Sequence, residues 1–521
     1  MSFADSLRRA ALKSVGPVSA LAAAAAGALA AAAFSVPQAS WFVLVSLAVL
    51  FGLAAGRGSK KEGFLLGWLW GLAFFGVGLR WCYDSIHVHG GLPAAAAAAA
   101  VLLLAAVLAV FPGAVALAAR AAPVSRRLKL VLLLPAAWTV AELLRGVEPV
   151  GFGWLSIGYA YPSDFFGAWA PILGVYGADL AAALTAGLAV ELLFGADNQN
   201  HRLRTLDAIV LGALVLGTFA LGDVRWSTPA DKLTVRLVQP DLPVMMRYDP
   251  VHAAERLARA EAMSVRTAAG AAPDLIVWPE STPAEALADG LGVPALAALE
   301  TARRTDATVI FNGFYRAAPR EYYNTLWMAR NDGKPAEPFY SKHHLVPFGE
   351  FVPTGFRWFV DALGIPMADQ ARGPVGGTPF AVEGVSGAAG ICYENMFGEE
   401  LRHAWDKGNP GFVLNTANLG WFGPSVLEQF TAMSAMRARE TSRPLLQAVQ
   451  NAHSALIGPD GRVERLAGSG AQNLDVTLVS NAGEPTPFVR FGHWPVLTLA
   501  LLMLALCAAA AFAGRGRAKD R

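Results

Sequence analysis

Residues Gly387 to Asn395 read Gly-Ala-Ala-Gly-Ile-Cys-Tyr-Glu-Asn, and the expectations for the rest of the chain start from this stretch. A small, apolar, Gly-rich run that ends in Cys-Tyr-Glu predicts a buried β-strand with Cys392 at the turn that follows it. The chain holds three cysteines, and Cys82 and Cys507 lie in or beside strongly apolar segments. Cys392 is therefore the cysteine of the polar region. A structural role is the alternative, because a free cysteine packs as a small hydrophobe.

The composition of the chain is that of a membrane protein. Of its 521 residues, 54% are hydrophobic and 16% are charged, which departs from the balance of soluble domains. A net charge of +2 without a Lys/Arg block in the polar region excludes a nucleic-acid-binding protein. An odd cysteine count and the lack of a Cys-x-x-Cys or His/Cys cluster predict neither a disulfide framework nor a metal, and we expect no cofactor.

Apolar runs of about membrane-spanning length occur eight times, seven before a long polar stretch and one after it. They predict eight transmembrane helices. In chain order the runs are Val15 to Phe34, Trp41 to Ala55, Phe64 to Leu79, Leu92 to Ala119, Leu130 to Leu144, Trp169 to Phe194, Leu206 to Leu221 and Trp494 to Phe512.

Positively charged residues predict the orientation of these spans, since Lys and Arg are retained on the cytoplasmic side. Basic residues precede the first span and follow every even-numbered span, whereas the odd-numbered exits carry almost none. Both termini are then cytoplasmic, and in a bacterial inner membrane the polar stretch is periplasmic. A cleaved signal peptide is an alternative for the first span, although its length favours an anchor. The predicted domains are residues 1–222 with seven spans, 223–490 outside, and 491–521 with the last span and the cytoplasmic tail.

The outside region is predicted to be an α/β domain, because short β-branched runs alternate with helical patterns. Such alternation implies a sheet with helices on its faces. The predicted strands are Leu233 to Val238, Leu275 to Trp278, Thr308 to Phe311, Phe380 to Val382, Phe412 to Leu414, Leu445 to Val449 and Val476 to Val479, and the helices are Val251 to Thr267, Val293 to Arg304, Gly398 to Asp406 and Val426 to Thr441.

Three strand ends in this region carry reactive side chains. Glu280 follows an apolar strand in Trp-Pro-Glu, Lys342 begins Lys-His-His-Leu-Val-Pro-Phe-Gly-Glu, and Cys392 is the third. Together, a thiol, an ammonium and a carboxylate can perform acyl transfer, with the carboxylate as proton acceptor and the ammonium as partner of the developing oxyanion. Taken singly, each has an ordinary alternative: Glu280 as a helix cap, Lys342 as a solvated charge, and the two histidines as surface groups.

These three motifs, in this order, resemble the Glu, Lys and Cys motifs of the nitrilase superfamily. Set between seven spans and one, they resemble the apolipoprotein N-acyltransferase family in particular, over nearly the whole chain. The resemblance implies an αββα sandwich for the outside domain. It also implies that Cys392 is the nucleophile, Glu280 the general base, Lys342 the oxyanion stabiliser, and Glu350 a second carboxylate that orients the triad.

The resemblance extends to supporting positions. Tyr393 and Glu394 would shape the pocket, and Asn324 matches a further family position. Tyr248 lies in the arm after the first strand, where the family usually carries an aromatic residue, and is expected to contact substrate.

Two further motifs match with departures. Asn415-x-x-Asn418-x-x-Trp421-Phe-Gly resembles the family's Asn-rich loop, which makes Trp421 a candidate substrate contact, but Leu419 stands where an Asp is common and Ala417 where a Ser or Thr is common. Glu142-x-x-Arg145 with the following Phe-Gly-Trp resembles the membrane-side motif, with Gly153 in place of the usual Pro. Arg145 and Arg80 are candidates to hold a phosphate headgroup, with interfacial snorkelling as the alternative.

The implied reaction is an exchange in two steps. A phospholipid gives an acyl chain to Cys392 as a thioester, and the α-amino group of the diacylglyceryl-cysteine on an apolipoprotein then takes it. Water must be kept away from such an intermediate. The apolar stretches Phe351 to Met367 and Trp421 to Phe430 are candidate lids, with ordinary packing over the core as the alternative.

Other classes of protein compete with this interpretation. A membrane-tethered amidase would use the same triad on small amides, but it would not need seven preceding spans. A non-catalytic lipoprotein-binding protein would not need an intact Glu280, Lys342 and Cys392. A transporter is disfavoured because few spans carry internal charges, with Asp179 the main exception.

Overall fold

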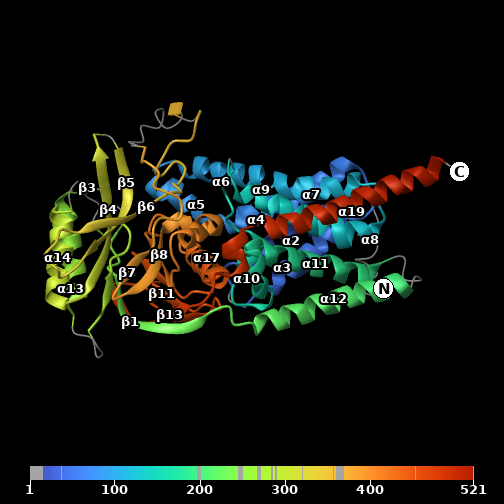
Figure 1. Ribbon diagram of the computed structural model, residues 1–521. Helices are drawn as coiled ribbons and strands as arrows, with labels where there is room; N and C mark the ends of the chain where they lie inside the picture. Colours follow the sequence, from blue (N-terminus) through green and yellow to red (C-terminus); the bar gives the residue numbers. More distant parts are fainter. Residues whose placement is uncertain are drawn as a thin grey trace. The chain divides into compact units, whose positions relative to one another are not determined.

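The computed structural model describes residues 16–36, 38–148, 150–195, 201–243, 250–266, 272–282, 286–287, 290–319, 321–355, 357–358, 369–451 and 453–519 (Figure 1). The chain divides into two compact units. The helical unit comprises Met1–Val224, Phe422–Ala432 and Phe491–Arg521, and the α/β unit comprises Arg225–Trp421 and Met433–Arg490. The segment Phe422–Ala432 thus groups with the helices, although it falls inside the range 223–490 that we predict as one domain.

Close backbone approach through glycine characterises the helical unit. A Cβ on Gly27 would lie 2.0 Å from the Trp70 carbonyl oxygen, and one on Gly67 would lie 2.1 Å from that of Pro112. Small residues allow such contacts between apolar helices. The helices are α2 (Pro17–Ala32), α3 (Trp41–Ala54), α4 (Lys60–Gly78), α5 (Trp81–Asp84), η1 (Ser85–His89), α6 (Ala94–Leu108), α7 (Val110–Ala121), α8 (Arg126–Leu128), η2 (Lys129–Leu133), α9 (Leu134–Gly146), η3 (Ile157–Ala160), η4 (Phe165–Trp169), α10 (Ala170–Leu173), α11 (Val175–Phe194), α12 (His201–Gly222) and α19 (Trp494–Lys519).

Within the described residues, four helices are long and apolar enough to cross a membrane, or five if a pair bent by 56° counts as one span. The four are Ala94–Ala121, Val175–Phe194, His201–Gly222 and Trp494–Ala513, and the bent pair joins Lys60–Gly78 to Trp81–His89.

The other predicted spans are less regular. Two of them correspond to the shorter apolar helices Pro17–Ala32 and Trp41–Ala54. The run Leu130 to Leu144 begins within the π-helical turn η2 and continues into α9. Several membrane-compatible helices are therefore present, and the count of eight stays a prediction.

Two sheets form the core of the α/β unit. The first has the strand order β13-β1-β2-β4-β5-β6, with β3 paired to β4, and the second has the order β12-β11-β10-β9-β8-β7. The strands are β1 (Thr228–Gln239), β2 (Leu275–Val277), β3 (Ala286–Leu287), β4 (Thr308–Ala318), β5 (Glu321–Ala329), β6 (Glu337–Ser341), β7 (Phe380–Val382), β8 (Val385–Ile391), β9 (Phe412–Ala417), β10 (Leu445–Val449), β11 (Ala455–Ile457), β12 (Val463–Leu466) and β13 (Gln472–Ala482).

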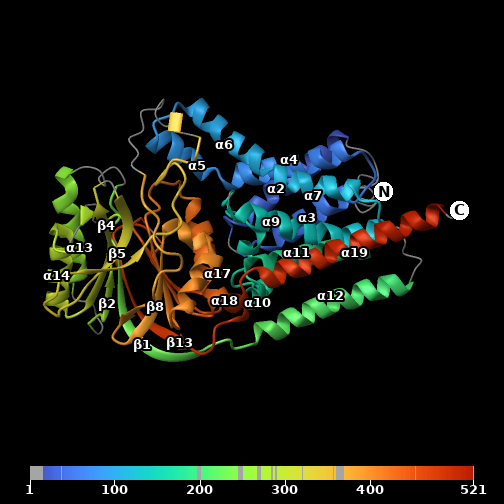
Figure 2. The same ribbon diagram turned by 45° about the horizontal axis from the view of Figure 1, so that its top comes forward.

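Helices cover one face of each sheet. Leu257 and Ala260 of α13 (Ala253–Ser264) and Ala298 of α14 (Val293–Thr305) share a buried cluster with the first sheet. Ala435 and Ala438 of α17 (Val426–Thr441) pack with the second sheet. Figures 1 and 2 show both sheets between α13 and α14 on one side and α17 on the other, which is the layering of an αββα sandwich. The remaining elements are η6 (Pro250–His252), η7 (Cys392–Met396), α16 (Gly398–Leu401), η8 (Arg402–Asp406) and α18 (Pro487–Phe491).

The structure has a strand or helix within every range predicted for the α/β unit, but several bounds differ. Strands β1, β4, β9 and β13 extend further than predicted, whereas β2 ends at Val277 and α13 at Ser264, and the predicted Thr267 lies outside the described residues. The predicted helix Gly398 to Asp406 is the short helix α16 followed by the 3-10 turn η8. β7, β10 and α17 have the predicted bounds. Strands β3, β5, β6, β11 and β12 are not among the predicted elements, and Asn324 and Pro338 interrupt the apolar pattern of β5 and β6.

Candidate active site

Cys392 follows β8 directly and begins the 3-10 turn η7, as the Gly-rich sequence predicts. The strand is built from small residues because its neighbours are close: a Cβ on Gly387 would lie 2.6 Å from the ring of Phe412 and 2.7 Å from that of Phe380. Cys392 itself has φ +51°, a left-handed conformation that side chains rarely adopt. Strain of this kind costs about 1–3 kcal/mol and collects at functional sites.

Glu280 is brought to the same place by β2. Its side chain is only 5% exposed, and both oxygens accept hydrogen bonds, Oε1 from Asn324 Nδ2 at 3.0 Å and Oε2 from the Asn418 backbone N–H at 3.0 Å. The next residue, Ser281, has φ +67°, and its N–H donates to Asn312 Oδ1 at 3.1 Å. The turn after β2 is therefore held by side-chain amides from β4 and β5.

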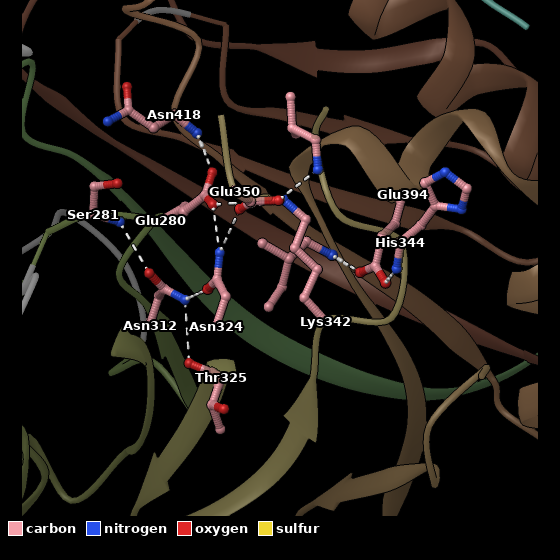
Figure 3. Close-up of polar contacts among 12 residues, drawn as sticks. Glu280, Ser281, Asn312, Asn324, Thr325, Lys342, His344, Glu350, Glu394 and Asn418 are labelled. Carbon is pink, nitrogen blue, oxygen red and sulfur yellow. Dashed lines mark hydrogen bonds and ion pairs between the residues drawn. The ribbon is translucent and has the colours of Figure 1, made fainter. Parts of the chain in front are cut away.

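Lys342 follows β6 and is 1% exposed. Its Nζ lies 2.9 Å from Glu350 and 4.0 Å from Glu280 Oε1. Glu350 also accepts from the Val346 N–H at 2.8 Å and from Asn324 Nδ2 at 3.2 Å. Figure 3 shows the Asn324 amide reaching both carboxylates, with the Lys342 ammonium on the other side of Glu350.

Burial, together with the neighbouring carboxylates, keeps the Cys392 thiol protonated by raising its pKa. Burial raises the pKa of Cys392, and the Glu280 and Glu350 carboxylates raise it further, against the opposing effects of Lys342 and of a hydrogen bond from the Asn418 backbone. Burial alone would lower the pKa of Lys342, but Glu350 and Glu280 outweigh burial and raise it, so the ammonium stays charged. The site thus combines a neutral thiol, a permanent cation and a carboxylate able to accept a proton.

Glu394 forms a second buried carboxylate site beside the first. Its Oε2 accepts from the Ile391 N–H at 2.7 Å and the Tyr340 hydroxyl at 2.8 Å. Its Oε1 accepts from the N–H groups of His343 at 2.7 Å and His344 at 3.1 Å. Burial nevertheless raises the pKa of Glu394 above its usual value. One carboxylate therefore joins the residue before Cys392 to the two residues after Lys342.

Two asparagines that hydrogen-bond within the site had no assigned role in the sequence interpretation. Asn418 was part of the Asn-rich loop, and its backbone N–H reaches both Glu280 and Cys392. Asn312 was missed: its Nδ2 donates to Asn324 Oδ1 at 2.6 Å and to the Thr325 carbonyl at 3.1 Å. The available signal was an asparagine in the otherwise apolar run Thr-Val-Ile-Phe-Asn of β4.

Of the predicted pocket residue Tyr393 and the predicted substrate contacts Tyr248 and Trp421, the structure describes Tyr393 and Trp421. Tyr393 is buried, with its ring centroid 5.7 Å from that of His344 and 5.5 Å from that of Phe397. Trp421 is half-buried at the end of the loop after β9. Tyr248 lies outside the described residues, and so does most of the predicted lid from Phe351 to Met367.

Arg145 is fully buried in the helical unit. Its guanidinium donates to the carbonyls of Phe152 and Trp154, both at 2.6 Å, and pairs with Glu142 at 2.6 Å. The predicted Glu-x-x-Arg motif is thus an ion pair that holds the Phe-Gly-Trp loop. This placement supports a structural role, and a headgroup contact for Arg145 stays a prediction.

No metal-binding group appears within the described part of the chain, where no three His, Cys, Asp or Glu side chains are placed to hold an ion.

Comparison with known families matches both units. Residues 26–188 match the Apolipoprotein N-acyltransferase N-terminal domain, and residues 234–480 match Carbon-nitrogen hydrolase. Together with the two sheets, the second match supports a nitrilase-like fold for the α/β unit. Among solved structures, a CN-hydrolase superfamily protein from Xanthomonas campestris aligns with a TM-score of 0.35 and 18% identity, over 52% of this chain and 97% of that protein.

Relatives of full length are also similar. The apolipoprotein N-acyltransferase of Bordetella bronchiseptica is 36% identical over 95% of this chain and 96% of its own length. That of Ralstonia nicotianae is 35% identical over 92% of this chain and 90% of its own length. This chain therefore belongs to the apolipoprotein N-acyltransferase family, whose members are acyltransferases of the carbon-nitrogen hydrolase superfamily.

Proposed function

We propose that this protein transfers an acyl chain from a phospholipid to the α-amino group of the diacylglyceryl-cysteine on an apolipoprotein, through a thioester on Cys392. Family membership supports acyl transfer to apolipoproteins in general. The observation that carries the finer mechanism is the convergence of Cys392, Glu280 and Lys342 in one buried site.

In the first step, Glu280 takes the proton from the Cys392 thiol as the sulfur attacks the ester carbonyl of the phospholipid. A C–S bond forms and the ester C–O bond breaks, and Glu280 returns the proton to the departing lysophospholipid oxygen. A base is needed because the raised pKa of Cys392 leaves little thiolate. The Lys342 ammonium stabilises the negative charge on the carbonyl oxygen in the tetrahedral state.

In the second step, the acceptor amine attacks the thioester. A C–N bond forms, the C–S bond breaks, and Glu280 moves the amine proton to the departing sulfur. The sequence of two half-reactions is a ping-pong mechanism, and Cys392 returns to its starting state. Glu350 and Asn324 act as positioning residues, because their hydrogen bonds hold Lys342 and Glu280.

A membrane location suits both substrates, since each is anchored in lipid and can reach the enzyme by lateral diffusion. We propose eight spans, cytoplasmic termini, and a periplasmic catalytic domain over residues 223–490 in a bacterial inner membrane. The basic residues after even-numbered spans support this orientation. Tyr248 and Trp421 are proposed as substrate contacts, and Tyr393 and Glu394 as groups that shape the site.

The experiment that tests this function incubates purified protein with phospholipid carrying an isotope-labelled acyl chain, without acceptor. Mass spectrometry should then find the acyl mass on the Cys392 peptide, labile to hydroxylamine, and a diacylglyceryl peptide should remove it. Cys392→Ser should give neither the adduct nor product.

Two results would overturn the proposal. Acylation of the diacylglyceryl peptide by Cys392→Ser would exclude Cys392 as the nucleophile. An unmodified Cys392 peptide, together with ammonia release from small amides, would indicate an amidase that uses the same residues.

A further inference from the structure

The imidazole of His344 links the segment that carries Lys342 to the segment that carries Cys392. Its Nδ1 lies 2.8 Å from Glu400 Oε1, and because a carboxylate oxygen accepts, Nδ1 is the donor. Its ring stacks on Phe397, with centroids 3.5 Å apart and planes at 20°. Phe397 directly follows η7 and Glu400 lies in α16, so both partners belong to the chain just after the nucleophile.

The backbone of the same residue makes a second link. The His344 N–H donates to Glu394, which also accepts from the Ile391 N–H just before Cys392. Figure 3 shows His344 and Glu394 next to each other on the side of Lys342 away from Glu280. The chain around Cys392 is therefore tied to the Lys342 segment on both sides of the nucleophile.

Burial makes this link specific. His344 is 5% exposed, and a hydrogen bond to a carboxylate contributes more than a neutral one. His343 makes a different bond, from Nδ1 to the Gly373 carbonyl at 2.7 Å. The two neighbouring imidazoles thus fix their loop in two directions, and of these two rings it is that of His344 that reaches the nucleophile's segment.

We propose that His344 and Glu400 form a positioning pair that fixes the Lys342 ammonium relative to the Cys392 sulfur. This inference rests on the proposed function, because it assumes that these two groups act together. Neither side chain touches the reacting atoms in this role. The pair sets the distance at which Lys342 meets the oxyanion and influences the thiol, and small errors in such distances are costly to catalysis.

Two substitutions separate the two contacts of His344. His344→Phe keeps a ring that can stack on Phe397 and removes the donor to Glu400. His344→Asn keeps an N–H donor near the position of Nδ1 and removes the ring. Glu400→Gln keeps an oxygen that can accept the hydrogen bond from His344 but removes the negative charge. Because Glu400 is half-buried, this substitution is the mildest of the three.

The test measures kcat and KM for phospholipid, and the rate at which iodoacetamide modifies Cys392, read from its peptide. We expect His344→Phe to lower kcat about tenfold, because it removes one hydrogen bond to a charged group. KM should be unchanged, and iodoacetamide should modify Cys392 more slowly. His344→Asn should recover most of kcat, and Glu400→Gln should lower it by about threefold.

The matched control is His403→Phe. His403 makes the same kind of bond, Nδ1 to Asp406 Oδ2 at 2.7 Å, but the pair is exposed and lies outside the site. If His344→Phe and this control have the same kcat and the same rate of Cys392 modification, the proposed positioning role is wrong. If His344→Phe does not fold, the same comparison is made between Glu400→Gln and the control. Failure of the proposed function would show separately, as activity in Cys392→Ser.

Discussion

Each unit buries a cation that is paired with a carboxylate, yet the two clusters differ in what they can do. In the α/β unit, Lys342 lies between Glu350 and Glu280, at 2.9 and 4.0 Å. In the helical unit, Arg145 pairs with Glu142 at 2.6 Å, and the Asp179 carboxylate accepts a hydrogen bond from the Gly158 N–H.

The difference lies in where the cation's donors are directed. The Arg145 guanidinium donates hydrogen bonds to Glu142, to Ser156 and to the carbonyls of Phe152 and Trp154. These bonds hold a loop. The Lys342 ammonium lies close enough to Cys392 to lower the thiol pKa. Buried charge alone therefore does not identify a catalytic site, and the proposal for the α/β unit depends on the thiol of Cys392 on a strained turn beside the cation.

The largest effect on the chemistry of Cys392 is expected from Glu280→Gln. Loss of a general base lowers kcat by about 10²–10⁴-fold. The Glu280 carboxylate also raises the pKa of Cys392, so the variant should react faster with iodoacetamide at pH 8 while it turns over more slowly. Both rates can be measured on one preparation. A parallel fall in both would indicate general damage to the site instead of loss of a base.

Lys342→Gln should lower kcat by about 10²–10³-fold, as expected for loss of an oxyanion partner. Because Lys342 lowers the pKa of Cys392, its removal should slow modification by iodoacetamide, the opposite of Glu280→Gln. Glu280→Gln and Lys342→Gln together test whether these two charges shift the pKa of Cys392 in opposite directions. Faster modification of Cys392 in Lys342→Gln would contradict the claim that Lys342 lowers this pKa.

The pH dependence of the wild-type thiol gives a smaller, graded effect. Below its pKa a thiol gains about tenfold in thiolate for each pH unit. Because burial and the carboxylates raise the pKa of Cys392, its modification rate should still climb above pH 9, where a free cysteine with a pKa of about 8.5 levels off. N-acetylcysteine is the control. A plateau below pH 8 would mean that the resting enzyme holds a thiolate.

Arg145→Ala should have the smallest effect on Cys392. Removing one partner of a buried ion pair costs about 3–5 kcal/mol, so the midpoint of thermal unfolding in detergent should fall. The iodoacetamide rate of Cys392 in the folded fraction should stay within about twofold, because the role argued for Arg145 is structural. A large change in that rate without loss of stability would give Arg145 a part in the chemistry.

Several features were determined by the sequence alone. The apolar content predicted a membrane protein, and β-branched runs predicted strands such as β7 and β10 at their observed bounds. Gly387 to Ile391 predicted the buried strand that ends just before Cys392, because its residues are small and apolar. These are local properties, since hydrophobic periodicity and residue size act within a few positions of the chain.

The tertiary structure decided which polar groups meet. The bridge from Asn312 through Asn324 to Glu280 and Glu350 joins the interiors of β4 and β5 to the loops after β2 and β6. Glu394 accepts hydrogen bonds from four donors on two segments about fifty residues apart. No local pattern encodes such partners, because buried polar groups are satisfied by whatever the packed strands bring within reach. The sequence thus determined which reactive residues this protein carries, and long-range strand pairing decided that they form one site around a strained cysteine.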